Sequence, residues 1–340
     1  MRAAAIFGHG GLDVLGVTDL HDPSPAMGEI LVEVKAAAVN HLDLWVRRGG
    51  RGEMSFPHVV GSDGAGVIRK LGEGVSALKE GQEVVLYPGL VCMRCSACLH
   101  GQHSLCEHFA ILGAARWGTC GELVTLPAYA VAPRPPHMSW EETAALTVDH
   151  LTAWRMVMTR AGVHAGQTVL IHGIGGGVAL AALQWAKLVG AVTIVTSSSD
   201  AKLDCARALG ADHSLNYQKG DVGTRVRQIA DGGVDAVIDS VGSATWKASF
   251  EAVRRGGTIV NCGITSGCDA VTNVRTLYWN QLNVLGSTLG SLGEWHDMLR
   301  AAAQAKLKPV IDSVLPLQEI RAAQAKMEEG KQFGKIVLRP

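Results

Sequence analysis

Hydrophobic and polar positions follow two different rhythms along the 340 residues of this chain. Up to about residue 135, short apolar runs alternate with turn residues, which is typical of strands in an antiparallel barrel-like or sandwich unit. The predicted strands of this region are 29–39, 65–71, 83–87 and 122–126. A helical pattern follows from Ser139 to Arg160, with Ser139 as its N-cap and two glutamates in its first turn.

From Gln167 the rhythm changes to apolar strands that alternate with helices. Repeated βαβ units of this kind predict a parallel sheet with helices on both faces. The predicted strands are 168–172, 192–196, 213–216, 234–239 and 258–261, and the helices between them are 176–189, 201–209, 222–230 and 244–253. Beyond residue 290 we expect helices at 294–305 and 317–328 and a last strand at 335–338. The predicted fold class is therefore α/β, a Rossmann-type doubly wound parallel sheet combined with a second, β-rich domain.

Composition narrows the classes of function. Hydrophobic residues make up 47% and charged residues 18%, which excludes bulk disorder. Lys+Arg and Asp+Glu are both 31, so no basic field favours nucleic acid or an anionic membrane. The N-terminus has no signal-peptide pattern, and no apolar stretch reaches the ~20 residues that a bilayer requires. We expect a cytoplasmic protein that acts on a small molecule.

A glycine-rich turn stands between the first strand and the first helix of the βαβ series. The chain there reads His172-Gly-Ile-Gly-Gly-Gly-Val178. Glycines let the backbone approach a pyrophosphate, and the first N–H groups of the helix point at its charge. The predicted contacts are Gly173, Gly175, Gly176, Gly177 and Val178. The alternative is an ordinary strand–helix turn, against which the βαβ context counts.

The end of the second strand selects the nucleotide. In NAD-binding proteins of this fold, an acidic residue about 20 positions after the glycine turn hydrogen-bonds the ribose 2′-OH. Ser197 stands at that position here. Hydroxyls at Ser197 and Ser198, together with Lys202, suit a 2′-phosphate, so NADP(H) is favoured over NAD(H). Alternatively, the serines cap the next helix and Lys202 is a solvated surface residue.

Four of the eight cysteines stand close together in the sequence. Cys92, Cys95, Cys98 and Cys106 follow the pattern C-x2-C-x2-C-x7-C. Four thiolates satisfy tetrahedral zinc and leave no open coordination position, so we predict one structural zinc ion per chain. Some ferredoxins hold iron–sulfur clusters with similar spacing, and unrelated thiols are the third interpretation. In a large chain without a signal peptide, the other cysteines are expected to be free thiols of a reducing compartment.

The cysteine quartet ahead of a nucleotide turn resembles the zinc-type medium-chain dehydrogenase/reductase family. The segments 26–32, 61–66 and 334–337 are also similar to family motifs, and the resemblance covers essentially the whole chain. It implies a GroES-like catalytic domain over 1–150, to which 290–340 returns, and a Rossmann NADP(H)-binding domain over 151–289. It further implies an active site in the cleft between these domains, and a homodimer or homotetramer.

Alcohol dehydrogenases of this family carry a second, catalytic zinc ion, and the resemblance shows its ligands replaced here. Asn40 stands at the position of the first cysteine, Ser62 and Asp63 stand at the positions of a His-Glu pair, and no cysteine occurs near residues 148 and 149. Asn, Ser and Asp make a poor site for zinc. The pattern looks more like the family's quinone and enone or enoyl reductases, in which the conjugated substrate spreads the developing charge.

The resemblance also implies roles for individual residues. Asn40 and Ser62 would donate hydrogen bonds to a substrate carbonyl, Asp63 would order these donors, and His41 would be a proton donor or a cofactor contact. The alternative for each is a buried polar residue satisfied within the fold. Further cofactor contacts are expected where later strands end and near the C-terminus: Asp239, Ser240, Val241, Cys262, Gly263, Ile264, Leu289 and Lys335.

Three functions remain compatible with these patterns. The first is an NADPH-dependent reductase that transfers hydride to an activated C=C bond or a quinone without a catalytic zinc ion. The second is an NAD(P)-dependent alcohol dehydrogenase or ketone reductase, zinc-free or with an unusual metal set. The third is a nucleotide-binding protein that has lost its chemistry, since fold alone does not set function.

Overall fold

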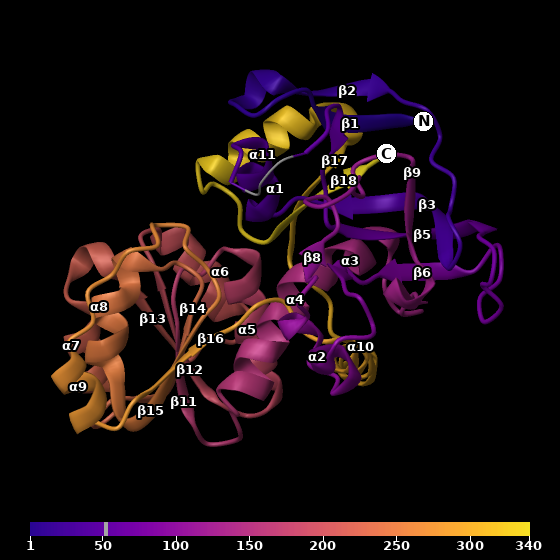
Figure 1. Ribbon diagram of the computed structural model, residues 1–340. Helices are drawn as coiled ribbons and strands as arrows, with labels where there is room; N and C mark the ends of the chain where they lie inside the picture. Colours follow the sequence, from indigo (N-terminus) through magenta and orange to yellow (C-terminus); the bar gives the residue numbers. More distant parts are fainter. Residues whose placement is uncertain (51–53) are drawn as a thin grey trace. The chain divides into compact units, whose positions relative to one another are not determined.

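The computed structural model describes residues 1–50 and 54–340, and these form two compact units. Unit 1 comprises residues 1–148 and 291–340, and unit 2 comprises residues 149–290. Figure 1 shows that unit 1 combines both ends of the chain, drawn in indigo and yellow. Within the described residues, no helix is both long and apolar enough to cross a membrane.

Unit 2 is built on a six-stranded parallel sheet in the order β13-β12-β11-β14-β15-β16. The order reverses at β11, as in doubly wound dinucleotide-binding folds, so the predicted parallel sheet is confirmed. Figure 1 shows α7 and α8 on one side of the strands and α5 on the other. The strands are β11 (Thr168–Ile171), β12 (Val192–Ser197), β13 (His213–Asn216), β14 (Val234–Asp239), β15 (Val253–Asn261) and β16 (Asn283–Gly286). The helices are α5 (Gly177–Leu188), α6 (Asp200–Ala208), α7 (Val222–Ile229), α8 (Ser243–Ala252) and α9 (Val274–Trp279).

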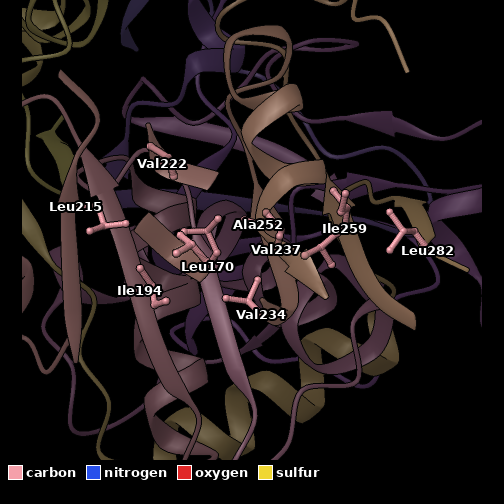
Figure 2. Close-up of a cluster of buried hydrophobic side chains, with 11 residues drawn as sticks. Leu170, Ile194, Leu215, Val222, Val234, Val237, Ala252, Ile259 and Leu282 are labelled. Atoms are coloured by element: carbon pink, nitrogen blue, oxygen red, sulfur yellow. The ribbon is translucent and has the colours of Figure 1, made fainter. Parts of the chain in front are cut away.

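The core of unit 2 is a row of side chains that crosses the sheet. Leu170 lies opposite Ile194 on one side and Val237 on the other, and Val237 lies opposite Ile259. Figure 2 shows this row packed together with Val222 of α7 and Ala252 of α8. Burial of a side chain of this size is worth roughly 1.5–3 kcal/mol, so the row anchors the strand ends that carry the nucleotide turns.

Unit 1 contains a larger, mixed sheet. Its strands follow the order β10-β6-β5-β3-β18-β17, and β9 also pairs with β3. The strands are β3 (Glu29–Ala38), β5 (Asp63–Leu71), β6 (Glu83–Leu86), β9 (Leu123–Pro127), β10 (Val131–Pro133), β17 (Ile311–Pro316) and β18 (Lys335–Arg339). Small sheets add β1 (Arg2–Ile6), β2 (Leu15–Asp19), β4 (His58–Val59), β7 (Gly89–Leu90) and β8 (Ala110–Ile111). The strand pairs described within residues 1–135 are antiparallel, as predicted, whereas β17 and β18 of the C-terminal segment pair in parallel.

Small residues let a helix lie close to that sheet. Ala36, Ala38 and Ala65 are fully buried beneath Ala144 and Ala145 of α3 (Trp140–Ala145). Val337 of β18 completes this cluster and lies opposite Ala38 of β3. The last strand of the chain therefore lies beside the third.

The remaining helices differ from the predicted ones in extent. The helix expected over 139–160 is three segments, α3, α4 (Thr147–Trp154) and a π-helical segment (Arg155–Arg160). Ser139 is its N-cap, as predicted, and forms a capping box with Glu142. Unit 1 also has α2 (Ser96–Leu99), α10 (Leu292–Ala305), α11 (Ile320–Glu328) and the unpredicted α1 (His41–Arg47). The pattern missed α1 because the helix is only seven residues long.

Candidate functional site

The glycine-rich turn of unit 2 has a shape that only glycine supports. Gly173 and Gly175 have φ angles of 71° and 118°, and α5 begins immediately afterwards at Gly177. A Cβ atom at Gly175 would lie 2.9 Å from Cδ and 3.3 Å from Nζ of Lys202. The Lys202 side chain thus lies along the turn, and a larger residue at 175 would displace it. A glycine-rich turn at a helix N-terminus, with an ammonium beside it, fits a dinucleotide phosphate.

The serines at the end of β12 belong to a polar cluster with the end of β13. Ser197 lies opposite Asn216, and its Oγ accepts a hydrogen bond of 3.2 Å from Ser199 N. Asn216 Nδ2 donates to the Ser198 carbonyl at 3.0 Å and to Asp200 Oδ1 at 2.9 Å. The sequence prediction did not include Asn216. Its signal was its place as the last residue of the predicted strand 213–216, since the carboxyl ends of parallel strands meet at one edge of the sheet.

Asp239 shapes its turn from inside the protein. Its carboxylate is fully buried, and Oδ1 accepts hydrogen bonds from Val241 N at 2.7 Å and Gly242 N at 3.1 Å. Both oxygens have partners, because Oδ2 accepts from Thr245 Oγ1 at 2.8 Å. Asp239 therefore holds the backbone of the predicted contacts Ser240 and Val241 in place.

The last predicted contacts of unit 2 lie after β15 and β16. A Cβ atom at Gly263 would lie 2.3 Å from the Ser240 carbonyl oxygen, so these two strand-end turns touch. Burial raises the pKa of Cys262 to about 12, which keeps its thiol neutral. Ile264 is 49% exposed, whereas Leu289 is buried and has a left-handed φ of 46°. Every predicted contact of unit 2 lies within or after the carboxyl end of a parallel strand.

The four clustered cysteines of unit 1 fit one metal ion. Their sulfur atoms all lie within 4.8 Å of one another, and Cys92 Sγ lies 3.6 Å from Cys106 Sγ and 4.0 Å from Cys98 Sγ. Tetrahedral zinc with Zn–S bonds of ~2.3 Å requires sulfur separations of about 3.8 Å. No other group of three or more His, Cys, Asp or Glu side chains across residues 1–50 and 54–340 could hold a metal ion.

Ionisation of these thiols also depends on a metal. Hydrogen bonds from the backbone N–H groups of Arg94 and Cys95 lower the pKa of Cys92 to about 6. Burial raises the pKa of Cys98 to about 12. A bound cation would reverse the effect at Cys98, because zinc binds the thiolate. The quartet would hold zinc in a closed shell, where the ion supports folding and takes no part in the reaction.

A second buried polar cluster in unit 1 gathers Asn40, Asp63 and Lys335. Lys335 Nζ lies 2.6 Å from Asn40 Oδ1 and 2.8 Å from Asp63 Oδ2, and Asn40 Nδ2 donates to the same Asp63 oxygen at 3.0 Å. All three side chains are at most 4% exposed. Lys335, predicted as a cofactor contact, thus lies with the predicted catalytic residues Asn40 and Asp63.

The other oxygen of Asp63 is also occupied. Oδ1 accepts from the Thr147 hydroxyl and from Val148 N, the latter at 2.6 Å. Four donors therefore surround one carboxylate and occupy both of its oxygen atoms. The sequence prediction missed Thr147, because nothing near position 147 marks it as a partner for a residue 84 positions away.

Asp43 supports the cluster from α1. Its oxygens accept hydrogen bonds from Asn40 N at 2.8 Å and Gly61 N at 3.0 Å, which tie the start of α1 to the loop before β5. Burial raises the pKa of Asp43 to about 6, although these two N–H groups and Lys335 act in the opposite direction. Asp43 is thus a buried carboxyl that titrates close to neutral pH.

The remaining predicted catalytic residues face different surroundings. The hydroxyl of Ser62 donates to the Leu112 carbonyl at 2.7 Å and is fully buried. Its proton is therefore used within the fold, and so is the amide of Asn40, whose Nδ2 also contacts the Ala38 carbonyl at 3.4 Å. His41 is the first residue of α1 and is half-buried. Among these four residues, His41 has the most accessible side chain.

Comparison with known proteins places the whole chain. The family model for the alcohol dehydrogenase GroES-like domain matches residues 26–136, and that for the zinc-binding dehydrogenase matches residues 177–304. An alcohol dehydrogenase of Geobacillus stearothermophilus is 31% identical over 96% of both chains. The chain belongs to the zinc-type medium-chain dehydrogenases/reductases. As a member of this family it is an oxidoreductase, with a GroES-like domain as well as the Rossmann-type one.

Relatives within the family carry different activities in their names. A solved structure of an NAD-dependent alcohol dehydrogenase matches with a TM-score of 0.96 and 42% identity over all of both chains. A crotonyl-CoA reductase of Streptomyces avermitilis is 30% identical over 94% of this chain and 80% of its own. Family membership therefore establishes that the chain is an oxidoreductase but not which reaction it catalyses. The reaction has to be argued from the residues of this chain.

The family's two zinc sites differ in this member. The cysteine quartet fits the structural zinc ion of the medium-chain dehydrogenases. Asn40 and Ser62, which the resemblance sets at the positions of the family's catalytic zinc ligands, offer only an amide and a hydroxyl and do not fit a zinc ion. The remaining candidate ligand, Asp63, already accepts hydrogen bonds from four donors, one of them an ammonium. None of the three side chains Asn40, Ser62 and Asp63 is a thiol or an imidazole, the ligands that zinc prefers.

Proposed function

We propose that this chain is an NADPH-dependent reductase that adds hydride to an activated C=C bond of an enone, enoyl thioester or quinone, without a catalytic zinc ion. The observation that carries the proposal is the Asn40–Asp63–Lys335 cluster. Asn40 and Asp63, which by the resemblance stand at positions of the family's catalytic ligands, are here hydrogen-bonded to each other and to Lys335. Alcohol oxidation without a metal would forgo several kcal/mol of charge stabilisation, whereas a conjugated carbonyl spreads the negative charge over its own atoms.

The residues of the chain would divide the work as follows. Bound NADPH supplies a hydride to the β-carbon of the substrate. The Asn40–Asp63–Lys335 cluster fixes the start of α1, and with it the position of His41. His41 either delivers the proton that the α-carbon receives, or contacts the cofactor. The products would be NADP⁺ and the saturated carbonyl compound or, from a quinone, NADP⁺ and the hydroquinone.

His41→Gln separates these two roles. Loss of a proton donor lowers kcat and changes its pH profile while the dissociation constant for NADPH stays the same. Loss of a cofactor contact raises that dissociation constant and leaves the pH profile of kcat unchanged. If the variant matches the wild type in both kcat and the dissociation constant for NADPH, His41 has neither role.

The choice of NADP(H) rests on the end of β12 and on Lys202. No carboxylate stands at Ser197 to repel a 2′-phosphate, and the Lys202 ammonium lies beside the glycine turn. Lys202→Ala should raise the dissociation constant for NADPH at least tenfold and change that for NADH little. Titration of nicotinamide fluorescence would measure both constants. Lys247→Ala, which removes an exposed lysine of α8, is the matched control. Equal affinity of the wild type for both cofactors would refute this choice.

The reaction itself is tested on a substrate panel. We expect enones, enoyl thioesters or quinones to oxidise NADPH, and saturated alcohols to be poor substrates. Dialysis against a chelator that removes only weakly held metal should not change turnover while one zinc ion per chain remains. Fast oxidation of simple alcohols that such dialysis abolishes would overturn the proposal.

A second candidate is an alcohol dehydrogenase or ketone reductase. It is favoured by the 42% identity to the structure described as an NAD-dependent alcohol dehydrogenase. The same substrate panel separates the two, because this NAD(P)-dependent enzyme would reduce simple ketones or oxidise saturated alcohols.

We also propose that the enzyme is a cytoplasmic homodimer or homotetramer. Strand β16 is an edge of the unit 2 sheet, and α9, which precedes it in the sequence, exposes at least 60% of Val274, Tyr278 and Trp279. Paired with a second copy, such an edge would no longer be open to aggregation. Light scattering should give twice or four times the mass of one chain, and a monomer would refute this part.

A further inference from the structure

A buried histidine lies directly beneath the nucleotide turns of unit 2, and neither the proposed reaction nor the phosphate contacts use it. His172 is the last residue before Gly173 and is 1% exposed. Its backbone N–H donates to the Ile238 carbonyl at 3.1 Å, which binds the end of β11 to β14. A buried imidazole must pair both of its ring nitrogens, so its partners show what it holds together.

The two ring nitrogens reach two different elements. Nδ1 lies 3.2 Å from Thr196 Oγ1 at the end of β12, and Nε2 lies 3.2 Å from Ser249 Oγ in α8. Both hydroxyls are buried as completely as the imidazole. The ring therefore bridges the strand that carries the predicted 2′-phosphate site and the helix that follows the Asp239 turn.

The direction of these hydrogen bonds follows from the neighbours. Thr196 Oγ1 accepts a hydrogen bond from Gly173 N at 3.3 Å. In the described structure, the Thr196 hydroxyl in turn donates its proton to His172 Nδ1. Ser249 Oγ has two other acceptors, the Thr245 carbonyl at 3.0 Å and Asp239 Oδ2 at 3.3 Å. Nδ1 is therefore the acceptor of the ring, and Nε2 carries its hydrogen.

The result is one directed chain of hydrogen bonds. It runs from the Gly173 amide through Thr196, His172 and Ser249 to the Asp239 carboxylate. At its two ends, Gly173 opens the phosphate turn and Asp239 binds the amides of the Val241 turn. These turns also touch directly, because a Cβ atom at Gly173 would lie 2.9 Å from Val241 Cγ2.

We infer that His172 is a positioning residue for the cofactor, a neutral Nε2–H imidazole that holds the Gly173 turn and the Asp239 turn in one fixed arrangement. The inference rests on dinucleotide binding by unit 2 and goes beyond the reaction proposed above. Burial lowers the pKa of His172, in keeping with a neutral ring, although Asp239 acts in the opposite direction. A protonated ring would donate to Thr196 Oγ1, which already accepts from Gly173, and would break the direction of the chain.

Two matched threonine variants on the same strand test the inference. Thr196→Val removes the hydroxyl that joins Gly173 to His172, and we expect NADPH to bind about tenfold more weakly. Thr193→Val removes an equally buried hydroxyl from the other end of β12, where it bonds Asp212 Oδ2 at 3.0 Å. This control should change the dissociation constant less than twofold. Equal dissociation constants for the two variants would overturn the inference.

Variants of the histidine add a rescue. His172→Leu should bind NADPH at least tenfold more weakly than the wild type. His172→Asn keeps an acceptor close to the position of Nδ1 and should recover part of that loss. No recovery by asparagine, with both proteins folded by circular dichroism, would count against an acceptor role at Nδ1.

A measurement on the wild-type enzyme tests the inference even if the variants fail to fold. Nitrogen-15 spectra of the histidine rings, with His172 assigned, should show a neutral Nε2–H tautomer at pH 7. An Nδ1–H tautomer or a charged ring would overturn the inference. Failure of the wild type to bind either NADPH or NADH would overturn nucleotide binding as well, whereas normal binding by His172→Leu would remove the inference alone.

Discussion

Unit 1 carries two polar clusters that answer the same electrostatic problem in opposite ways. The cysteine quartet gathers four thiols that become a stable set of thiolates only around a cation. The Asn40–Asp63–Lys335 cluster contains its own cation, the Lys335 ammonium, 2.8 Å from the Asp63 carboxylate. The first cluster depends on an ion from solution, and the second is complete without one. Membership of a zinc-dependent family therefore does not by itself predict a metal ion at a given position. The side chains around that position decide whether an ion is needed.

Loss of the structural zinc ion would have the largest effect on this comparison. Cys98→Ser should abolish stoichiometric zinc in elemental analysis, because an open shell of three thiolates binds the ion far more weakly. Structural zinc contributes on the order of 10 kcal/mol in small domains, so we expect a fall in melting temperature of at least ~10 °C.

Cys205→Ser provides the control, since Cys205 is an exposed thiol of α6 outside the quartet. It should retain one zinc ion and the wild-type melting temperature. Retention of zinc by Cys98→Ser would contradict the closed four-sulfur site.

Breaking the buried ion pair should have the next largest effect. Lys335→Met leaves the Asp63 carboxylate buried without its cation, which costs about 3–5 kcal/mol in urea unfolding. Combination with Asp63→Asn should cost less than the sum of the single losses, because no unpaired charge then remains. Lys331→Met, which breaks an exposed pair with Glu329, should cost less than about 1 kcal/mol. Strict additivity of the Lys335 and Asp63 variants would show that the pair is not coupled.

Asp43 adds a smaller effect that depends on pH. Burial raises its pKa to about 6, so the folded protein keeps a proton that the unfolded chain releases near pH 4. Its contribution to stability is therefore full below about pH 4 and is lost as the pH rises through 6. The free energy of unfolding of the wild type, minus that of Asp43→Asn, should fall by roughly 3 kcal/mol between these limits. A difference that is constant with pH would show that Asp43 titrates in the usual range.

Ser62 should give the smallest effect. Its hydroxyl proton is bonded to the Leu112 carbonyl, so Ser62→Ala should cost about 1 kcal/mol of stability and leave turnover within twofold. A donor to the substrate oxyanion would instead lose about a hundredfold in turnover. Such a loss would show that Ser62 takes part in the reaction and does not only support the fold.

Local patterns were sufficient to predict the fold of unit 2 and the quartet. Strand β14 begins and ends at the predicted residues, because a strand that is buried along almost its whole length is marked by its own apolar residues. The cysteines of the quartet lie within fifteen residues of one another, so their spacing alone indicates a metal site. Strand β17 escaped prediction, because four of its six residues are only partly buried and the other two are exposed.

The second cluster of unit 1 could be predicted only in part. Asn40 and Asp63 were found through resemblance, but their hydrogen-bond partners depend on long-range pairing. Lys335 meets Asp63 across 272 positions of sequence, through β18 beside β3 and β3 beside β5. No local property of Lys335 distinguishes it from a lysine that would contact a phosphate. The same limit hid Thr147, whose hydroxyl reaches Asp63 from the start of α4.

The place of β18 beside β3 has a consequence for biosynthesis. Unit 2 is one continuous segment, so it can fold as soon as it leaves the ribosome, since domains generally fold as units during synthesis. Unit 1 has to wait, because its central strand β3 receives its β18 neighbour only after the whole of unit 2 and residues 291–334 have been made. Until then the buried carboxylate of Asp63 lacks its ammonium partner, and a chain interrupted before Lys335 would have one finished unit and one open sheet edge.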